Sequence, residues 1–312
     1  MNAIFVFALV LLLAVLLSRR AGRTLLSLAA IFLFAGVLVG QGVTGFVRLS
    51  PGDDLVKASA ELTLVLILFA DGMAVDAKAL RASWTLPARA LGLGFPLTVA
   101  ATALLARLLA GVSWAGGLLL GATLAPTDPV FAAAIVNHER VSERLRRLLN
   151  LESGLNDGLA LPIVAATLAS YQSATILGTL GSAALGPVVG AAVPFAVSRL
   201  ARLPMFAIRQ SYVPLAGVAT GLLVYCSARI TGANVFLAAF SAGVVIGIVA
   251  PRQARRLHAG GETVGTLAKF AAVFLFGALV SPCWLGRLDA GDWLFVALAL
   301  VDRKSTRLNS SH

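Results

Sequence analysis

Five carboxylates fall inside long apolar segments of this sequence, where acidic side chains are rare. They are Glu61, Asp71, Asp128, Glu152 and Asp157. An ionised side chain in the hydrocarbon core of a bilayer costs from about 2.5 to more than 10 kcal/mol, so such a group is a candidate for handling ions or protons. The residues around Asp128 and Asp157 make that chemistry more specific.

The segment around Asp128 predicts a helix that is interrupted in the middle of the bilayer. Pro126 and Pro129 stand three residues apart, on either side of Asp128. Each proline removes a backbone donor and clashes with the preceding turn, so one unbroken helix does not accommodate both. An Asp followed by Pro is typical of an N-cap and the first helical position. We therefore predict a second half-helix that begins at Asp128, close to a central ion site. A proline kink with a self-capping Asp128 is the alternative.

A second polar group begins the next apolar segment. Ser153 lies three and four residues before Asn156 and Asp157, so a helix places these three on one face, with Glu152 at its edge. Hydroxyl, amide and carboxylate oxygens suit a hard cation. A structural role through hydrogen bonds between helices is the alternative, chiefly for Glu152. In the same segment, Gly154 and Gly158 stand four residues apart, which permits close approach of a second helix.

These residues need a membrane scaffold to position them. Of the 312 residues, 59% are hydrophobic and 12% are charged, against about 45–50% and 25% in a soluble domain. A helix of about twenty apolar residues crosses a bilayer core of about 30 Å. Such runs occur at 3–18, 24–41, 58–76, 86–110, 114–137, 150–170, 174–198, 211–228, 232–250 and 264–281, and an eleventh begins near Asp292. The predicted class is an all-α membrane protein.

The basic residues predict the orientation. With the N-terminus outside, sixteen Lys and Arg residues fall in the inside loops and five fall outside. The inside loops are 18–24, 77–89, 138–149, 199–210 and 251–263. This bias follows the positive-inside rule, so the net charge of +11 indicates contact with anionic membrane lipid rather than a nucleic-acid partner. Basic residues follow the first apolar run instead of preceding it, which favours a retained helix over a signal peptide. We predict a multi-pass inner-membrane protein.

These motifs resemble the sodium/proton exchangers of the cation:proton antiporter family. The resemblance rests on the stretch from Ala125 to Val130, followed about twenty-five residues later by the stretch from Glu152 to Asp157. The stretches Leu68–Met73 and Phe236–Gly243 are also similar to that family. The resemblance covers roughly residues 1–301.

The resemblance implies an antiporter-type helical bundle, usually a homodimer, in which a core domain moves against a dimerisation domain. The bundle has thirteen spans, arranged as two six-helix inverted repeats, with two broken helices that cross at the midplane. In this chain, Pro126 and Pro129 would interrupt the first of the two broken helices. The transported Na⁺ and H⁺ are the only small partners implied, and no cofactor is.

The resemblance also assigns roles to individual residues. It implies that Asp157 binds the cation or the proton in alternation, in a Na⁺ site that includes Thr127, Asp128 and Ser153. Asn156 stands where electrogenic relatives have a second Asp, which implies one proton per cation. Two further acids have supporting roles in the family: Glu152 pairs with an arginine of the second broken helix, and Asp71 contributes through water.

The end of the sequence departs from this pattern. The eleventh apolar run ends after about ten residues at Val301, and residues 302–312 are polar throughout. We expect an incomplete transmembrane antiporter domain over 1–301, with about eleven of thirteen spans, and a foreign tail over 302–312. A genuine cytoplasmic tail after a short helix is the alternative.

Three other functions compete with Na⁺/H⁺ antiport. The first is K⁺/H⁺ antiport by a protein of the same fold. The second is a truncated chain without transport activity. The third is an enzyme. An intramembrane aspartyl protease needs two acids in paired motifs that face each other, and no matching pair occurs. The expectation is therefore a transporter and not an enzyme.

Overall fold

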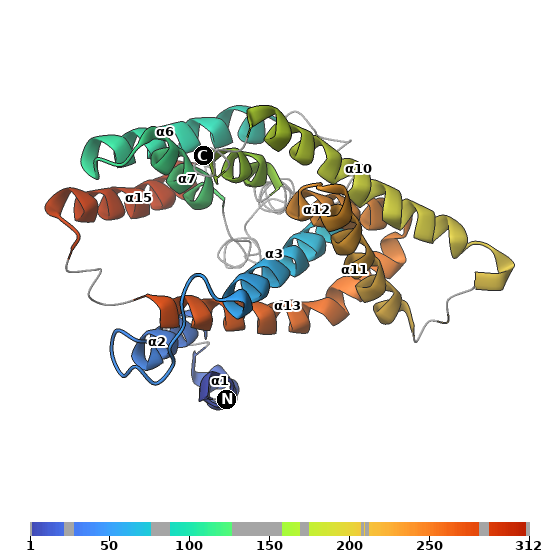
Figure 1. The fold of residues 1–312 in the computed structure, drawn as a ribbon, viewed down its shortest axis with the longest axis horizontal. Helices are drawn as coiled ribbons and strands as arrows, with labels where there is room; N and C mark the ends of the chain where they lie inside the picture. Colours follow the sequence, from blue (N-terminus) through green and yellow to red (C-terminus); the bar gives the residue numbers. More distant parts are fainter. Residues whose placement is uncertain are drawn as a thin grey trace. The chain divides into compact units, whose positions relative to one another are not determined.

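The computed structural model describes residues 2–21, 28–75, 88–126, 158–168, 175–206, 209, 212–280 and 287–309, which form helices and their connections without a strand (Figure 1). The helices are α1 (Asn2–Ala21), α2 (Leu28–Val39), α3 (Asp54–Ala74), α6 (Phe95–Leu109), α7 (Trp114–Leu124), Gly158–Leu168, α10 (Ile176–Leu200), α11 (Val213–Thr231), α12 (Val235–Val249), α13 (Pro251–Leu279) and α15 (Ala290–Asn309). A π-helical turn, η1 (Ala90–Gly94), leads into α6, and a 3₁₀ turn, η2 (Pro204–Phe206), follows α10. The predicted all-α class is confirmed.

The chain forms two compact units. The first comprises 1–67 with 261–288, and the second comprises 68–260 with 289–312. In the first unit, aromatic side chains of α1, α2 and α13 form the core. The rings of Phe32 and Phe270 stack with centroids 4.6 Å apart, and Phe7 lies 5.5 Å from Phe32. Offset stacking of this kind stabilises a core beyond the area it buries.

The second unit holds the packed helices that bear on function. α6 pairs with α7, α10 and α11 each pack on α12, and α15 lies along α6 (Figure 1). The turn between α11 and α12 is short because both helix ends are capped. Gly232 takes the left-handed conformation (φ 71°) after α11, and the Asn234 side chain accepts hydrogen bonds from the backbone N–H groups of Phe236 and Leu237.

Much of the helical surface is apolar. Leu97 on α6 is 74% exposed, and Leu177 on α10 is 82% exposed. Large apolar patches of this kind mark a surface that meets a membrane or a partner. Among the described residues, Leu91–Leu109 and Leu177–Leu200 are long and apolar enough to cross a bilayer, whereas the other apolar helices are shorter.

The sequence analysis predicted a loop at 251–263. This prediction is wrong, because these residues form the beginning of α13. Pro251 occupies the first helical position, where its missing N–H costs no hydrogen bond. One side of this polar segment packs: Ala254 is only 3% exposed, and the Leu257 side chain lies against Gly217 of α11. The polar residues of this segment concealed the helix from the sequence pattern.

α15 also runs further than the apolar pattern, since it includes the polar residues up to Asn309. Its beginning is fixed by reciprocal capping. The Asp289 carboxylate accepts from the N–H of Asp292 at 2.9 Å, and the Asp292 carboxylate accepts from the N–H of Asp289 at 3.0 Å. The predicted boundary between residues 301 and 302 therefore falls inside one helix.

Candidate functional site

α7 ends at the position where the sequence predicts a break. The N–H of Ala125 still donates to the carbonyl of Gly121 at 2.9 Å, and Pro126 is not helical. α7 therefore ends where the first half of the predicted broken helix was expected to end. Its continuation, with Thr127, Asp128 and Pro129, lies outside the described residues.

The second predicted cluster also lies outside the described residues, namely Glu152, Ser153, Asn156 and Asp157. The described helix that follows Asp157 in the sequence is Gly158–Leu168. The packing of this helix and of Ala125 therefore defines the framework that flanks the predicted ion site.

The helix Gly158–Leu168 packs on two sides. On one side, Ala160 forms a buried cluster with Phe95 and Val99 of α6, and Ala125 packs against this cluster. The end of α7 and the beginning of the helix after Asp157 thus share one packed neighbourhood. The two sequence segments predicted to form the ion site leave the described framework from this neighbourhood.

On its other side, the helix packs against α3 and α12. Leu161 forms a buried cluster with Leu68 of α3 and Leu237 of α12. Leu68 and Leu237 belong to the two additional stretches that resemble the antiporter family. The framework therefore brings all four family-like stretches, or the residues next to them, into one unit.

The helices α3 and α12 cross in direct backbone contact. A Cβ atom on Gly72 would overlap the carbonyl oxygen of Phe240, and a Cβ on Gly243 would overlap the carbonyl oxygen of Phe69. Only glycine permits this approach at both positions, because any other side chain would force the backbones apart. Asp71, which is half-buried on α3, stands next to Gly72 at this crossing.

The other intramembrane acid on α3, Glu61, belongs to the first unit rather than to this neighbourhood. Near it, the hydroxyl of Thr63 donates to the carbonyl of Ala268 on α13 at 3.4 Å. This contact joins α3 to α13 within the first unit.

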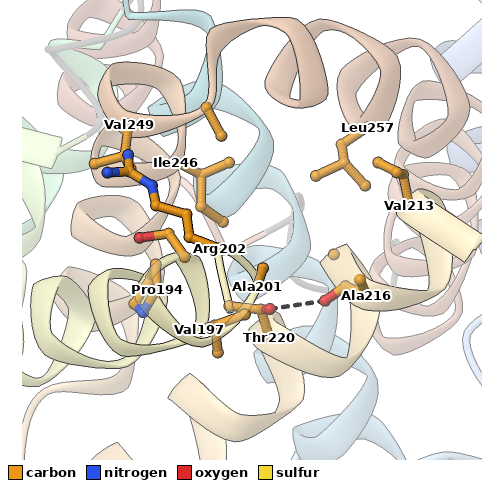
Figure 2. A pocket seen from close by; sticks show the side chains of 13 residues that line it. Pro194, Val197, Ala201, Arg202, Val213, Ala216, Thr220, Ile246, Val249 and Leu257 are labelled. Carbon is orange, nitrogen blue, oxygen red and sulfur yellow. Dashed lines mark hydrogen bonds between the residues drawn. The ribbon is translucent and has the colours of Figure 1, made fainter. Parts of the chain in front are cut away.

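A cavity of about 400 Å³ lies elsewhere in the second unit, between the C-terminal ends of α10 and α12 and the beginnings of α11 and α13 (Figure 2). Its wall is mostly aliphatic, with Arg202 as its charged residue. The hydroxyl of Thr220 is already engaged, since it donates to the carbonyl of Ala216 at 2.7 Å. Because no carboxylate is among its described lining residues, this cavity as described does not suit a bare cation.

Within the described part of the chain, no three His, Cys, Asp or Glu side chains converge as a metal-binding group. The predicted Na⁺ ligands, Thr127, Asp128, Ser153 and Asp157, all belong to the segments outside that part.

The sequence model of the family described as "Sodium/hydrogen exchanger, transmembrane" matches residues 6–302. The chain belongs to this family. It is therefore a multi-pass membrane protein of a transporter family, not an enzyme.

Two relatives in this family are antiporters by name. The K(+)/H(+) antiporter NhaP of Alkalimonas amylolytica is 29% identical over 302 residues, which cover 92% of this chain and 50% of the relative. The K(+)/H(+) antiporter NhaP2 of Shewanella oneidensis is 24% identical over 281 residues, which cover 86% and 48%. The chain thus spans about half the length of the curated relatives it matches.

A solved structure confirms the fold. The sodium proton antiporter MjNhaP1 of Methanocaldococcus jannaschii superposes with a TM-score of 0.77 at 18% identity, over 96% of this chain and 78% of that one. The helical arrangement of this exchanger-family chain is therefore of the antiporter type, as the sequence motifs predicted.

Sequence reasoning missed one residue of this neighbourhood, Phe240. A Cβ on Gly158 would lie 2.8 Å from Cε1 of the Phe240 ring. The glycine spacing at 154 and 158 predicted a close neighbour for this helix, but it did not identify the neighbour. The family-like stretch Phe236–Gly243 was the available signal.

Proposed function

We propose that this chain forms the transmembrane part of a monovalent cation:proton antiporter that exchanges Na⁺ for H⁺. Asp157 binds the cation or the proton in alternation, and Thr127, Asp128 and Ser153 contribute further oxygens. Asn156 in place of a second Asp makes the exchange electroneutral, with one proton for each cation.

The observation that carries this proposal is the end of α7 at Leu124, two residues before Pro126, in a chain that belongs to the exchanger family. A helix that stops inside the bilayer leaves carbonyl groups without intrahelical partners, and such ends are tolerated only where they are buried in protein or line a polar site. Transporters use these ends to hold ions near the midplane. Ala125 packs into the neighbourhood of the helix that follows Asp157, which supports a shared site.

K⁺ is the second candidate for the transported cation. The Alkalimonas and Shewanella relatives are named K(+)/H(+) antiporters, while the structural neighbour is named a sodium proton antiporter. Both ions bind oxygen ligands, so the choice depends on the size and number of those ligands.

The proposed setting is the inner membrane, with the N-terminus outside and a homodimeric assembly. The excess of basic residues in the inside segments supports this orientation. The three arginines near the beginning of α13, Arg252, Arg255 and Arg256, belong to a helix rather than a loop, and the proposal assigns them to the inside.

The test uses inside-out vesicles that hold a proton gradient, reported by a pH-sensitive dye. Two proteins are compared: the 312-residue chain, and the same chain continued after Val301 with the downstream part of the Alkalimonas relative, here called the extended chain. Addition of NaCl should dissipate the gradient more strongly than addition of KCl. Equal dissipation by choline chloride would contradict antiport, and a preference for KCl would assign K⁺.

A further inference from the structure

The cavity between α10, α11, α12 and α13 has one charged end and an apolar body. Among the residues described around it, Arg202 alone is charged, and in the view of Figure 2 its guanidinium lies on the side of the cavity away from Val213 and Leu257. The volume of about 400 Å³ falls within the range of about 300–1,000 Å³ that is usual for small-molecule sites, which are also mostly apolar with a few polar groups. The cavity therefore suits a molecule with one charged group and an apolar body.

The side-chain donors that this cavity offers to a ligand are concentrated on Arg202. The Ser198 hydroxyl donates to the carbonyl of Phe195 at 2.8 Å, and the Thr220 hydroxyl donates to the carbonyl of Ala216. A hydroxyl has one proton, so neither of them can donate to a ligand at the same time, whereas a guanidinium has five N–H donors. Arg202 is exposed, and no carboxylate among the described residues pairs with it. Its donors are therefore available to an anion.

The charge of the surrounding sequence also favours an anion. From residue 158 to residue 261, the sequence contains seven arginines and no Asp or Glu. This stretch includes α10, α11, α12 and the beginning of α13, which are the elements that line the cavity. No acid in this stretch can therefore neutralise Arg202, and a negatively charged ligand would be attracted to it.

The connection between α10 and α11 indicates that the ligand comes from the membrane. It begins and ends at the cavity, because both Arg202 and Val213 line it. Between them, the Met205 side chain is 88% exposed and the Phe206 side chain is 56% exposed, and Arg209 follows in the sequence. Exposed apolar and aromatic side chains among basic residues are typical of a segment that lies at the membrane–water interface. An anionic headgroup and an apolar chain are both present at that depth.

We propose that this cavity binds an anionic phospholipid of the membrane. The headgroup phosphate pairs with the Arg202 guanidinium, a combination that forms strong, often bidentate hydrogen bonds, and an acyl chain lies against the aliphatic wall. Basic pockets between membrane helices on the cytoplasmic side bind anionic headgroups in this way. The inference goes beyond the proposed antiport and does not depend on it, because the lipid can bind whether or not the protein transports ions.

The test uses phosphatidylglycerol with a photoreactive diazirine near the end of one acyl chain. It is added to the purified 312-residue chain and, in parallel, to the extended chain, and the labelled peptides are identified by mass spectrometry. Labelling should fall on the cavity wall and should be displaced by unlabelled phosphatidylglycerol, but not by phosphatidylcholine with the same acyl chains or by inorganic phosphate. Equal displacement by phosphatidylcholine would show an apolar cavity without anion recognition, and displacement by phosphate would show a site for a water-soluble anion. Either result, or the absence of label from the wall, would overturn the proposal.

Four variants locate the binding within the cavity. Arg202→Gln should weaken phosphatidylglycerol binding by about tenfold, because it removes a charge-assisted hydrogen bond, and Arg202→Lys should lie between this variant and wild type. Arg199→Gln is the matched control and should bind as wild type does, since the Arg199 guanidinium lies over the Phe195 ring at 4.8 Å and does not line the cavity. Ala216→Leu leaves every charge in place but adds bulk to the cavity, so it should weaken binding as well. Equal losses in Arg199→Gln and Arg202→Gln would indicate general attraction of lipid to a basic surface and would overturn the site, as would unchanged binding in both Arg202→Gln and Ala216→Leu.

Discussion

In the second unit, one proline pair follows the end of α7, whereas another lies inside α10. α7 stops at Leu124, directly before the pair at 126 and 129. α10 carries Pro187 and Pro194 in its interior and continues over 25 residues from Ile176 to Leu200. A proline pair by itself therefore does not decide whether a membrane helix breaks.

Spacing accounts for part of the difference. Pro126 and Pro129 delete two backbone donors within one turn, and Asp128 between them can cap a new helix. Pro187 and Pro194 are two turns apart and share one face, so each lost hydrogen bond is isolated. No capping side chain separates them: the residues from 188 to 193 are Val, Val, Gly, Ala, Ala and Val.

Packing accounts for the rest. α10 lies against α12 through its glycines: a Cβ on Gly190 would overlap the carbonyl oxygen of Ala238, and a Cβ on Gly186 would lie 2.9 Å from Cβ of Leu237. The N–H of Asn234 donates to the carbonyl of Ser182 at 2.9 Å, which adds a hydrogen bond between the start of α12 and α10. From this comparison we expect ion chemistry at an interrupted backbone with nearby acids rather than at proline itself.

The largest effect is expected from removing the Asp157 carboxylate from the proposed ion site near the end of α7. Asp157→Asn should reduce exchange to the level of empty vesicles while the protein still reaches the membrane, because an amide keeps the shape but cannot trade a proton for a cation. The measurement is cation-dependent dissipation of a pH gradient by the extended chain, with protein amount determined by immunoblot. Exchange near the wild-type rate would remove Asp157 from the mechanism.

Much of the arrangement could be predicted from the sequence, because its signals are local. The two prolines around Asp128 predicted where α7 ends, and the apolar runs predicted most of the helices. The polar segment 251–263 was predicted to be a loop, but it is helical and packs at Ala254 and Leu257. The contact between Phe240 and Gly158 could not be predicted, since residues eighty-two positions apart meet only through the packing of α12.

The second prediction compares removal of the prolines that follow α7 with removal of a proline inside α10. The double substitution Pro126→Ala with Pro129→Ala restores two donors and favours a continuous α7, since each interior proline costs about 3 kcal/mol or more. Exchange by the extended chain should fall by about tenfold or more, because the interrupted backbone is lost. Pro187→Ala on α10 is the matched control and should leave exchange close to wild type. Equal loss in both variants would show that proline kinks as such matter.

The third prediction concerns pH. If the proton and the cation share Asp157, the carboxylate must be deprotonated to bind the cation, and its apparent cation affinity should fall by about tenfold for each pH unit where the proton dominates. The half-saturating Na⁺ concentration is measured between about pH 6 and pH 9. A value independent of pH over that whole interval would exclude a shared site.

The smallest expected effects concern how α10 is held on α12. Gly190→Ala introduces a methyl group against a backbone carbonyl, and overpacking of this kind costs about 1–3 kcal/mol. Gly181→Ala, on the same helix, meets no atom within 4 Å and should raise the free energy of unfolding by up to about 1 kcal/mol through helix propensity. Both are measured as SDS-induced unfolding in mixed micelles. Similar values for the two variants would mean that the close approach to α12 does not support α10.

Concentrative uptake tests the central claim, coupled cation:proton exchange, most directly. The extended chain is reconstituted into liposomes with an acidic interior, with equal Na⁺ on both sides and the membrane potential clamped, and entry of radioactive Na⁺ is followed. The account predicts net accumulation of Na⁺ above the outside concentration, which collapses when the pH gradient is removed and is absent in Asp157→Asn. Net Na⁺ accumulation that does not respond to the pH gradient, or Na⁺ that only equilibrates while the gradient persists, would contradict the account.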